Sequence, residues 1–234
     1  MSNVENANSP VPPPPLRTLD FTETAFVSLI AYIVFAVTWW LVLLSMHDGP
    51  KTLFPAQSQF GAAYIVASPL TIAVPWIAIR MVRRDFVEYL ALNWPSSGEL
   101  LRALAITAML LLVEILAAYA VGAEEISPFG SAKESVGLFI LLVGGCIAVP
   151  LMEEFVVRGF MFRGWSQSFL GPVGAIVLSS ILWAMIHIQY DWFGRFWIFV
   201  TGLALGHFRW RSNSTWLTVM VHSAINVFFF FMSP

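Results

Sequence analysis

Three short groups of polar residues lie inside long apolar runs of the sequence, and their residue types could support hydrolysis. In chain order, the members of these groups are Glu153, Glu154, Arg158, Trp183, His187, His222 and Asn226. An ionisable side chain at membrane depth is costly unless it is paired or faces water. These residues are therefore the first candidates for a catalytic or binding site.

The first group places two carboxylates next to each other. On a helix, Glu154 and Arg158 share one face because they are four residues apart, whereas Glu153 is turned by about 100° from Glu154. The spacing predicts a structural Glu154–Arg158 ion pair and leaves Glu153 to face a cavity. The competing interpretation is a charged cap near a helix end after Pro150.

The other two groups each place two side chains on one helical face. Trp183 and His187 are four residues apart, as are His222 and Asn226. A histidine in an apolar helix is often a packed, hydrogen-bonded residue, and a histidine and an amide can simply hold helices together. These structural interpretations stay open for each pair taken alone.

Taken together, the groups supply a carboxylate, two imidazoles and an amide, which is enough for hydrolysis. Glu153 beside a histidine could take a proton from water, and the second histidine with Asn226 could stabilise an oxyanion. Alternatively Glu153, His187 and His222 could bind zinc, since two histidines, one glutamate and a water form a known catalytic set. We favour the metal-independent glutamate mechanism, because a carboxamide is a poor zinc ligand but a useful neutral donor. The sequence contains no H-E-x-x-H or G-x-S-x-G motif.

The composition predicts the elements that must position these side chains. Hydrophobic residues make up 58% of the 234 residues and charged residues 11%, against about 45–50% and 25% in soluble domains. We expect an all-α, polytopic transmembrane bundle, with the lipid bilayer as a partner. The net charge of −2 offers no basic surface for nucleic acid.

We expect about seven spans, with six to eight possible because the region 136–165 could hold an extra half-span. The predicted spans are 25–46, 61–79, 100–121, 136–151, 173–188, 192–208 and 215–232. Residues 1–20 form a proline-rich, disordered tail. Residues 21–135 hold the first spans and an interfacial helix at 86–102, and residues 136–234 form the catalytic core.

The distribution of positive residues predicts the orientation. Most arginines fall in alternate connections, which places the N-terminus in the cytoplasm and the C-terminus outside. Gly202 and Gly206 have the spacing of a close helix-packing face. Glu114 lies in the third span, and we favour a structural role for it.

The three groups resemble the motifs of the CAAX-processing and bacteriocin-processing intramembrane proteases, the CPBP or Abi family. The matching segments are Glu153-Glu154-x-x-x-Arg158, Trp183-x-x-x-His187 and His222-x-x-x-Asn226. Trp183 stands where the family commonly has phenylalanine, which adds an N–H that needs a partner. The resemblance covers roughly residues 136–232.

The resemblance implies an endopeptidase that cleaves peptide or membrane-protein substrates, prenyl-type ones included, at or within the membrane. It implies that Glu153 is the base, that His187 assists it, and that His222 and Asn226 stabilise the oxyanion. Glu154 and Arg158 match supporting positions. The short tails resemble the bacterial branch, so we expect a bacterial plasma membrane protein. The alternatives are a non-catalytic scaffold or bacteriocin-immunity protein of the same fold, and a small transporter, which the lack of internal repeats disfavours.

Overall fold

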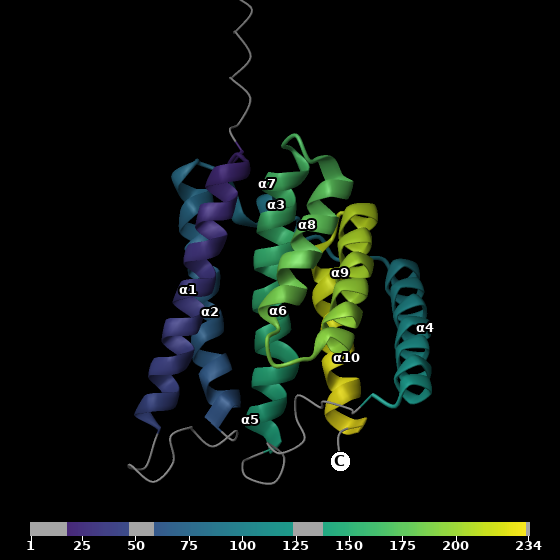
Figure 1. The fold of residues 1–234 in the computed structure, drawn as a ribbon. Helices are drawn as coiled ribbons and strands as arrows, with labels where there is room; N and C mark the ends of the chain where they lie inside the picture. The colour runs from purple at the N-terminus through teal and green to yellow at the C-terminus, as the bar shows by residue number, and fades with distance from the viewer. Residues whose placement is uncertain (1–17, 47–58, 124–137, 233–234) are drawn as a thin grey trace, which may run out of the picture.

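The computed structural model describes residues 18–46, 59–123 and 138–232 and is a bundle of helices (Figure 1), with no strand among these residues. The helical membrane bundle predicted from the sequence is confirmed. The α-helices are α1 (Phe21–Ser45), α2 (Phe60–Met81), α3 (Phe86–Leu90), α4 (Ser97–Val121), α5 (Leu138–Val143), α6 (Val149–Glu154), α7 (Phe162–Ser166), α8 (Gly171–Ile186), α9 (Trp192–Ser212) and α10 (Thr215–Met232). The predicted proline-rich tail lies outside the described residues up to position 17.

The two adjacent glutamates lie in the middle of one long helix, which we call the glutamate helix (residues 138–166). It runs through α5, α6 and α7 without interruption, because two π-helical segments, η3 (Gly144–Ala148) and η4 (Phe155–Met161), join them. Its apolar span of 28 residues, Phe139–Ser166, is long enough to cross a membrane. The alternative interpretation of Glu153 and Glu154 as a charged cap at a helix end is therefore wrong.

The first π-helical segment leaves one carbonyl without a helical partner. In η3 the N–H of Val149 donates to the carbonyl of Gly144, five residues earlier. The same pattern would pair the carbonyl of Gly145 with position 150, which is a proline and has no N–H. The Gly145 carbonyl therefore needs a donor from outside the glutamate helix.

Five helical segments in the described part of the chain are long and apolar enough to cross a membrane, where the sequence predicted seven spans. The remaining two predicted spans, 173–188 and 192–208, coincide with α8 and α9. α8 has 16 residues, which at about 1.5 Å each is shorter than the ~30 Å hydrocarbon core. Figure 1 shows the connection between α8 and α9 turning well above the lower ends of α1, α2 and α10.

The predicted close packing at Gly202 and Gly206 is present between α8 and α9. A Cβ atom on Gly202 would lie 2.9 Å from Cβ of Ser180, and one on Gly206 would lie 2.8 Å from a methyl carbon of Ile176. These distances are too short for a side chain at either glycine. The small residues therefore let the backbone of α9 approach α8.

The predicted interfacial helix at 86–102 is divided in the structure. α3 ends at Ala91, whose φ of 51° is left-handed, and Ser96 caps α4 with its side chain. Pro95 between them disfavours a helical conformation at the residue before it. The break has a structural use, since Ala91 accepts a hydrogen bond from the N–H of Thr215 at the start of α10 (2.9 Å).

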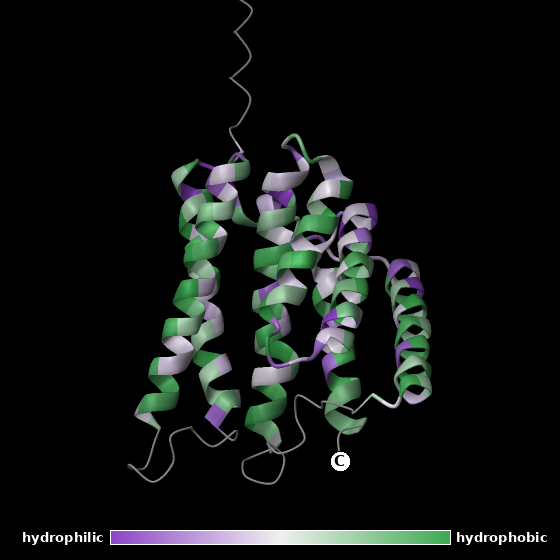
Figure 2. Ribbon diagram, in the orientation of Figure 1, coloured by the Kyte–Doolittle hydropathy of each residue, from purple (hydrophilic) through white to green (hydrophobic). Residues whose placement is uncertain are grey.

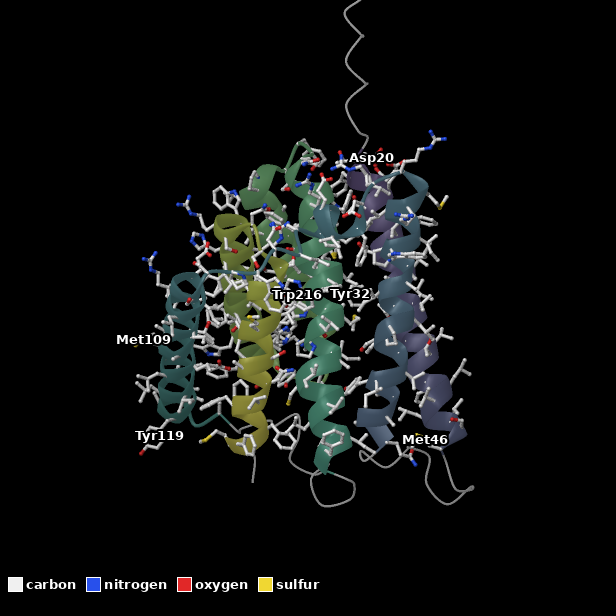
Figure 3. All side chains as sticks on the ribbon, turned by 180° about the vertical axis from the view of Figure 1, so that it is seen from behind. Asp20, Tyr32, Met46, Met109, Tyr119 and Trp216 are labelled. Carbon is white, nitrogen blue, oxygen red and sulfur yellow. The ribbon has the colours of Figure 1, made fainter. Side chains whose placement is uncertain are left out.

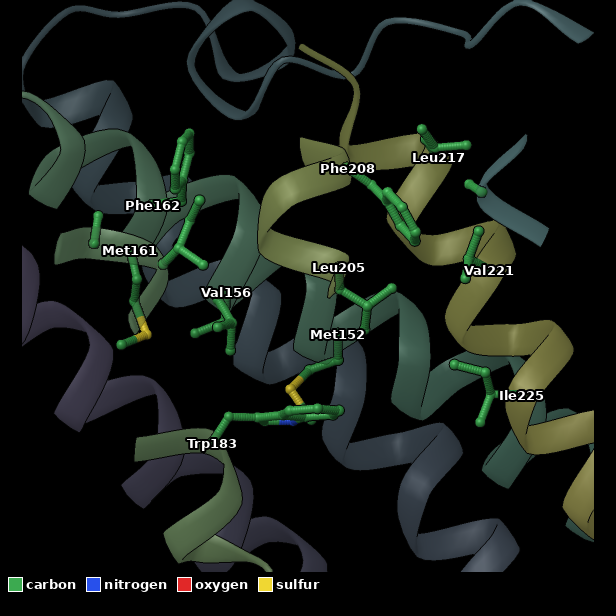
Figure 4. Packing of buried hydrophobic residues seen from close by; sticks show 14 of the residues in the cluster. Met152, Val156, Met161, Phe162, Trp183, Leu205, Phe208, Leu217, Val221 and Ile225 are labelled. Atoms are coloured by element: carbon green, nitrogen blue, oxygen red, sulfur yellow. The ribbon is translucent and has the colours of Figure 1, made fainter. Parts of the chain in front are cut away.

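Hydrophobic and hydrophilic residues occupy different parts of the bundle (Figure 2). Hydrophobic residues make up most of the outer helices, whereas hydrophilic residues occur at mid-height on α6 and in the connection between α8 and α9. A buried apolar cluster packs around the same level and includes Met152, Val156, Trp183, Leu205 and Val221 (Figure 4). The buried charged side chains Glu153, Glu154 and Arg158 therefore lie at the level of this apolar packing, apart from the hydrophilic residues at the helix ends.

The two ends of the described chain lie at opposite ends of the bundle. Figure 1 shows the start of α1 at the upper end and the end of α10 at the lower end. This arrangement agrees with the predicted placement of the termini on opposite sides of a membrane. The side that faces the cytoplasm stays a prediction.

Candidate active site

Glu154 is the structural member of the glutamate pair. Its side chain is completely buried, and Oε1 accepts a hydrogen bond from Nη1 of Arg158 at 3.0 Å. The same oxygen lies 2.9 Å from Nδ1 of His222 on α10. The ion pair that the spacing predicted is therefore present, and a contact with His222 that the spacing could not predict is added to it.

Arg158 connects the glutamate helix to two further helices. Its guanidinium lies over the ring of Trp183 on α8, with Cζ 4.3 Å from the ring centroid, and Nη2 donates to the carbonyl of Gly202 on α9 at 3.4 Å. Cation–π contacts of this kind are strongest where water is excluded. Because Arg158 is only 1% exposed, its charge depends on these partners and on Glu154.

His222 lies between the two glutamates. A carboxylate only accepts hydrogen bonds, so Nδ1 of His222 carries the proton that it donates to Glu154. Nε2 of His222 then faces Glu153, 4.0 Å from its Oε2 atom. Glu154 thus orients an imidazole toward its own neighbour in the sequence, in the way that a buried carboxylate orients a catalytic histidine.

Glu153 is held by a single hydrogen bond. The indole N–H of Trp183 donates to Oε2 of Glu153 at 2.8 Å. The N–H that distinguishes tryptophan from the family's usual phenylalanine therefore has a partner. Only Oε2 of Glu153 has a hydrogen-bond partner among the described residues, and 11% of the side chain is exposed.

Trp183 is the common neighbour of both imidazoles. Its ring meets His187 edge to face at a centroid distance of 5.1 Å, and His222 at 5.3 Å. Figure 4 shows the indole beneath the side chain of Met152, at the lower edge of the apolar side chains drawn there. Trp183 therefore fixes the relative positions of Glu153 and the two histidines.

His187 terminates α8 and is only half-buried. Its Nδ1 lies 2.7 Å from the carbonyl of Trp183, and a carbonyl only accepts, so Nδ1 is the donor. In the neutral ring, Nε2 then holds a free lone pair. No hydrogen bond or ion pair joins His187 to Glu153 in the part of the chain that the structure describes.

Asn226 supplies the donor that the first π-helical segment requires. Its Nδ2 donates to the carbonyl of Gly145 at 2.8 Å, the carbonyl that Pro150 leaves without a helical partner. The second N–H of the same amide has no protein partner among the described residues. One half of the Asn226 amide therefore has a structural role, and the other half is available for a ligand.

The predicted zinc ligands do not come together. Within the described residues, no group of three histidine, cysteine, aspartate or glutamate side chains is placed to hold a metal ion. Glu153 approaches His222, but His187 stays outside this pair. In the described residues, the arrangement of Glu153, His187 and His222 therefore does not fit a metal centre.

Comparison with known protein families matches the same region. The family model described as type II CAAX prenyl endopeptidase Rce1-like matches residues 135–228. The chain contains an Rce1-like domain. No curated protein and no solved structure matches the chain.

The Rce1-like domain holds every site residue that the sequence predicted, from Glu153 to Asn226. The resemblance to the CAAX-processing and bacteriocin-processing family is confirmed. The chain is therefore an integral membrane protein with a domain of an endopeptidase family. The helices before position 135 lie outside the match.

One residue near the site was missed by the sequence analysis, and it lies outside the Rce1-like domain. Tyr32 is the single tyrosine of α1, and its hydroxyl is enclosed without a hydrogen-bond partner in the described residues. The available signal was a phenol within an otherwise apolar span. Glu114 on α4, by contrast, forms no hydrogen bond or ion pair with the described residues and does not join the Glu153 group.

Proposed function

We propose that the chain is an intramembrane endopeptidase in which Glu153 activates the hydrolytic water. The observation that supports this most directly is the difference between the two adjacent glutamates. Glu154 is neutralised by Arg158 and bound by His222, whereas one carboxylate oxygen of Glu153 has no partner among the described residues. A general base needs such an oxygen within reach of water.

The proposed reaction needs only water and the peptide. Glu153 takes a proton from water while the water oxygen bonds to the carbonyl carbon, and the carbonyl electron pair moves onto the carbonyl oxygen. When the C–N bond breaks, that pair re-forms the carbonyl and the proton passes from Glu153 to the leaving nitrogen. The products are a new carboxyl group and a new amine, and Glu153 returns to its starting state.

The surrounding side chains have distinct proposed roles. Trp183 holds Oε2 of Glu153, and His222 presents Nε2 to the same atom because Glu154 fixes its Nδ1. His187 assists from the half-buried end of α8 through its free Nε2. The second N–H of Asn226 donates to the oxyanion, where one donor typically contributes about 10²–10³ in rate.

The position of the site supports a proposed substrate class. Glu153 stands midway along a membrane-crossing helix, so we propose membrane-associated or prenyl-type protein substrates that reach it from the bilayer. We further propose a bacterial plasma membrane location with the N-terminus in the cytoplasm.

The proposed function is tested with the purified protein in liposomes. A quenched peptide library that includes farnesylated and unmodified members should be cleaved by the wild type and not by Glu153→Gln. Glu114→Gln is the matched control, because it makes the same change in another membrane helix and should keep its activity. Absence of cleavage by the folded wild type across the library would overturn the proposal.

The orientation has its own test. Cys146 is the single cysteine of the chain and is buried, so it gives little background labelling. A cysteine at the exposed position Ser97 should resist an impermeant thiol reagent added to intact cells and react after lysis. Ready labelling in intact cells would reverse the proposed orientation.

A further inference from the structure

The hydroxyl of Tyr32 is an unusual feature of the interior. It is buried and has no hydrogen-bond partner among the described residues. Enclosing a hydroxyl without a hydrogen-bond partner destabilises the folded state. A phenylalanine would avoid this cost, so the hydroxyl calls for an explanation beyond packing.

The location of Tyr32 supplies one. Its ring packs against the buried cluster that contains Met152, Val156 and Trp183, all of them next to the proposed site. Figure 3 places Tyr32 in the middle of the bundle. The phenol also lies within electrostatic range of Glu153, Arg158 and Glu154, with Glu153 exerting the largest influence of the three.

The neutral donors that the sequence singled out already have internal partners. The indole N–H of Trp183 donates to Glu153, and the amide of Asn226 uses one N–H on Gly145. Tyr64 on α2 and Tyr190 also lie within electrostatic range of Glu153, but neither of their hydroxyls is among the enclosed atoms without a partner in the described residues. Among the tyrosines within electrostatic range of Glu153, Tyr32 is the one whose hydroxyl is enclosed without an internal partner in the described residues.

We propose that Tyr32 is a catalytic residue supplied from outside the Rce1-like domain. Its hydroxyl donates a hydrogen bond to the carbonyl oxygen of the scissile peptide bond and stabilises the oxyanion that forms there. This inference rests on the proposed endopeptidase function. It explains why the Tyr32 hydroxyl has no partner among the described residues, since the partner arrives with the substrate.

The test compares Tyr32→Phe with Tyr119→Phe, which removes the same hydroxyl from a position that is 89% exposed. Tyr32→Phe should lower kcat by about 10²-fold with little change in KM, because an oxyanion donor acts mainly in the transition state. Its melting temperature in detergent should be unchanged or higher, because no internal hydrogen bond is lost. Tyr119→Phe should match the wild type in all three measurements.

A second measurement separates chemistry from folding. A peptide aldehyde, which becomes tetrahedral in the site, should lose affinity for Tyr32→Phe, while a non-hydrolysable substrate analogue should bind both proteins equally. A wild-type kcat for Tyr32→Phe, or a loss that follows its melting temperature, would overturn the role of Tyr32 and leave the endopeptidase intact. If the wild type cleaves no peptide, both proposals fail.

Discussion

The glutamate helix and α4 both contain glutamate within an apolar membrane span, but the side chains around these glutamates differ. Helix α4 stands at the edge of the bundle, and only Ala103, Thr107 and Leu111 are buried along it. Its Glu114 forms no hydrogen bond or ion pair with the described residues. The glutamate helix is enclosed by its neighbours, and Glu154 has an arginine and a histidine as partners.

The difference shows what a charged residue needs inside a membrane protein. At the edge of the bundle, few neighbouring helices offer a carboxyl group a partner for its charge. In the centre, several helices contribute partners and hold each charge at a defined place. The arrangement in the centre can position a base, because the side chains that hold Glu154 also fix the surroundings of the neighbouring Glu153.

The largest expected effect tests the comparison directly. Glu153→Gln keeps the shape of the side chain but removes the base, so the turnover rate should fall by about 10²–10⁴-fold. The protein should stay folded, because Trp183 can donate to a carboxamide oxygen. Steady-state kinetics and detergent melting of Glu153→Gln measure both quantities. Activity close to the wild-type value would show that Glu153 is not the base.

Glu154→Gln should act mainly on stability. The substitution leaves Arg158 without its charge partner at a site where both side chains are 1% exposed or less. Breaking a buried pair in this way typically costs about 3–5 kcal/mol. Detergent melting should show the loss, and Glu88→Gln, which removes the exposed partner of Arg84, is the control that should melt normally. A normal melting curve for Glu154→Gln contradicts the proposed division between the two glutamates.

Asn226→Ala should affect both turnover and packing. The loss of an oxyanion donor predicts a decrease of about 10²–10³ in turnover with little change in substrate affinity. The loss of the bond to Gly145 leaves a buried carbonyl without a partner, which costs about 1–3 kcal/mol. Single-turnover kinetics and melting separate the two effects. A variant that is destabilised but fully active when folded would restrict Asn226 to the structural role.

Removal of metal should have the smallest effect. The described residues place no three ligands together, so turnover should survive thorough chelation. Kinetics on stripped protein, with the metal content measured in parallel, test this. Loss of activity that one equivalent of zinc restores would show that the histidines gather around a metal when the substrate or the ion is bound.

The sequence by itself determined the class of the protein and the features that depend on short range. Its composition indicated a helical membrane bundle, and the four-residue spacing of Glu154 and Arg158 predicted their ion pair. The spacing of Gly202 and Gly206 likewise predicted close packing, which the structure places against α8. These predictions hold because helical periodicity relates residues that are near each other in the chain.

Tertiary structure decided which side chains meet across helices. His222 and Glu154 are 68 residues apart, and Trp183 and Glu153 are 30 apart, so no spacing rule joins them. The pairing of Asn226 with Gly145 depends on a π-helical turn and on Pro150, which only the three-dimensional structure brings together with α10. Tyr32 approaches the site for the same reason. Packing sets these contacts because each helix is rotated and shifted until its apolar faces and small residues fit those of its neighbours.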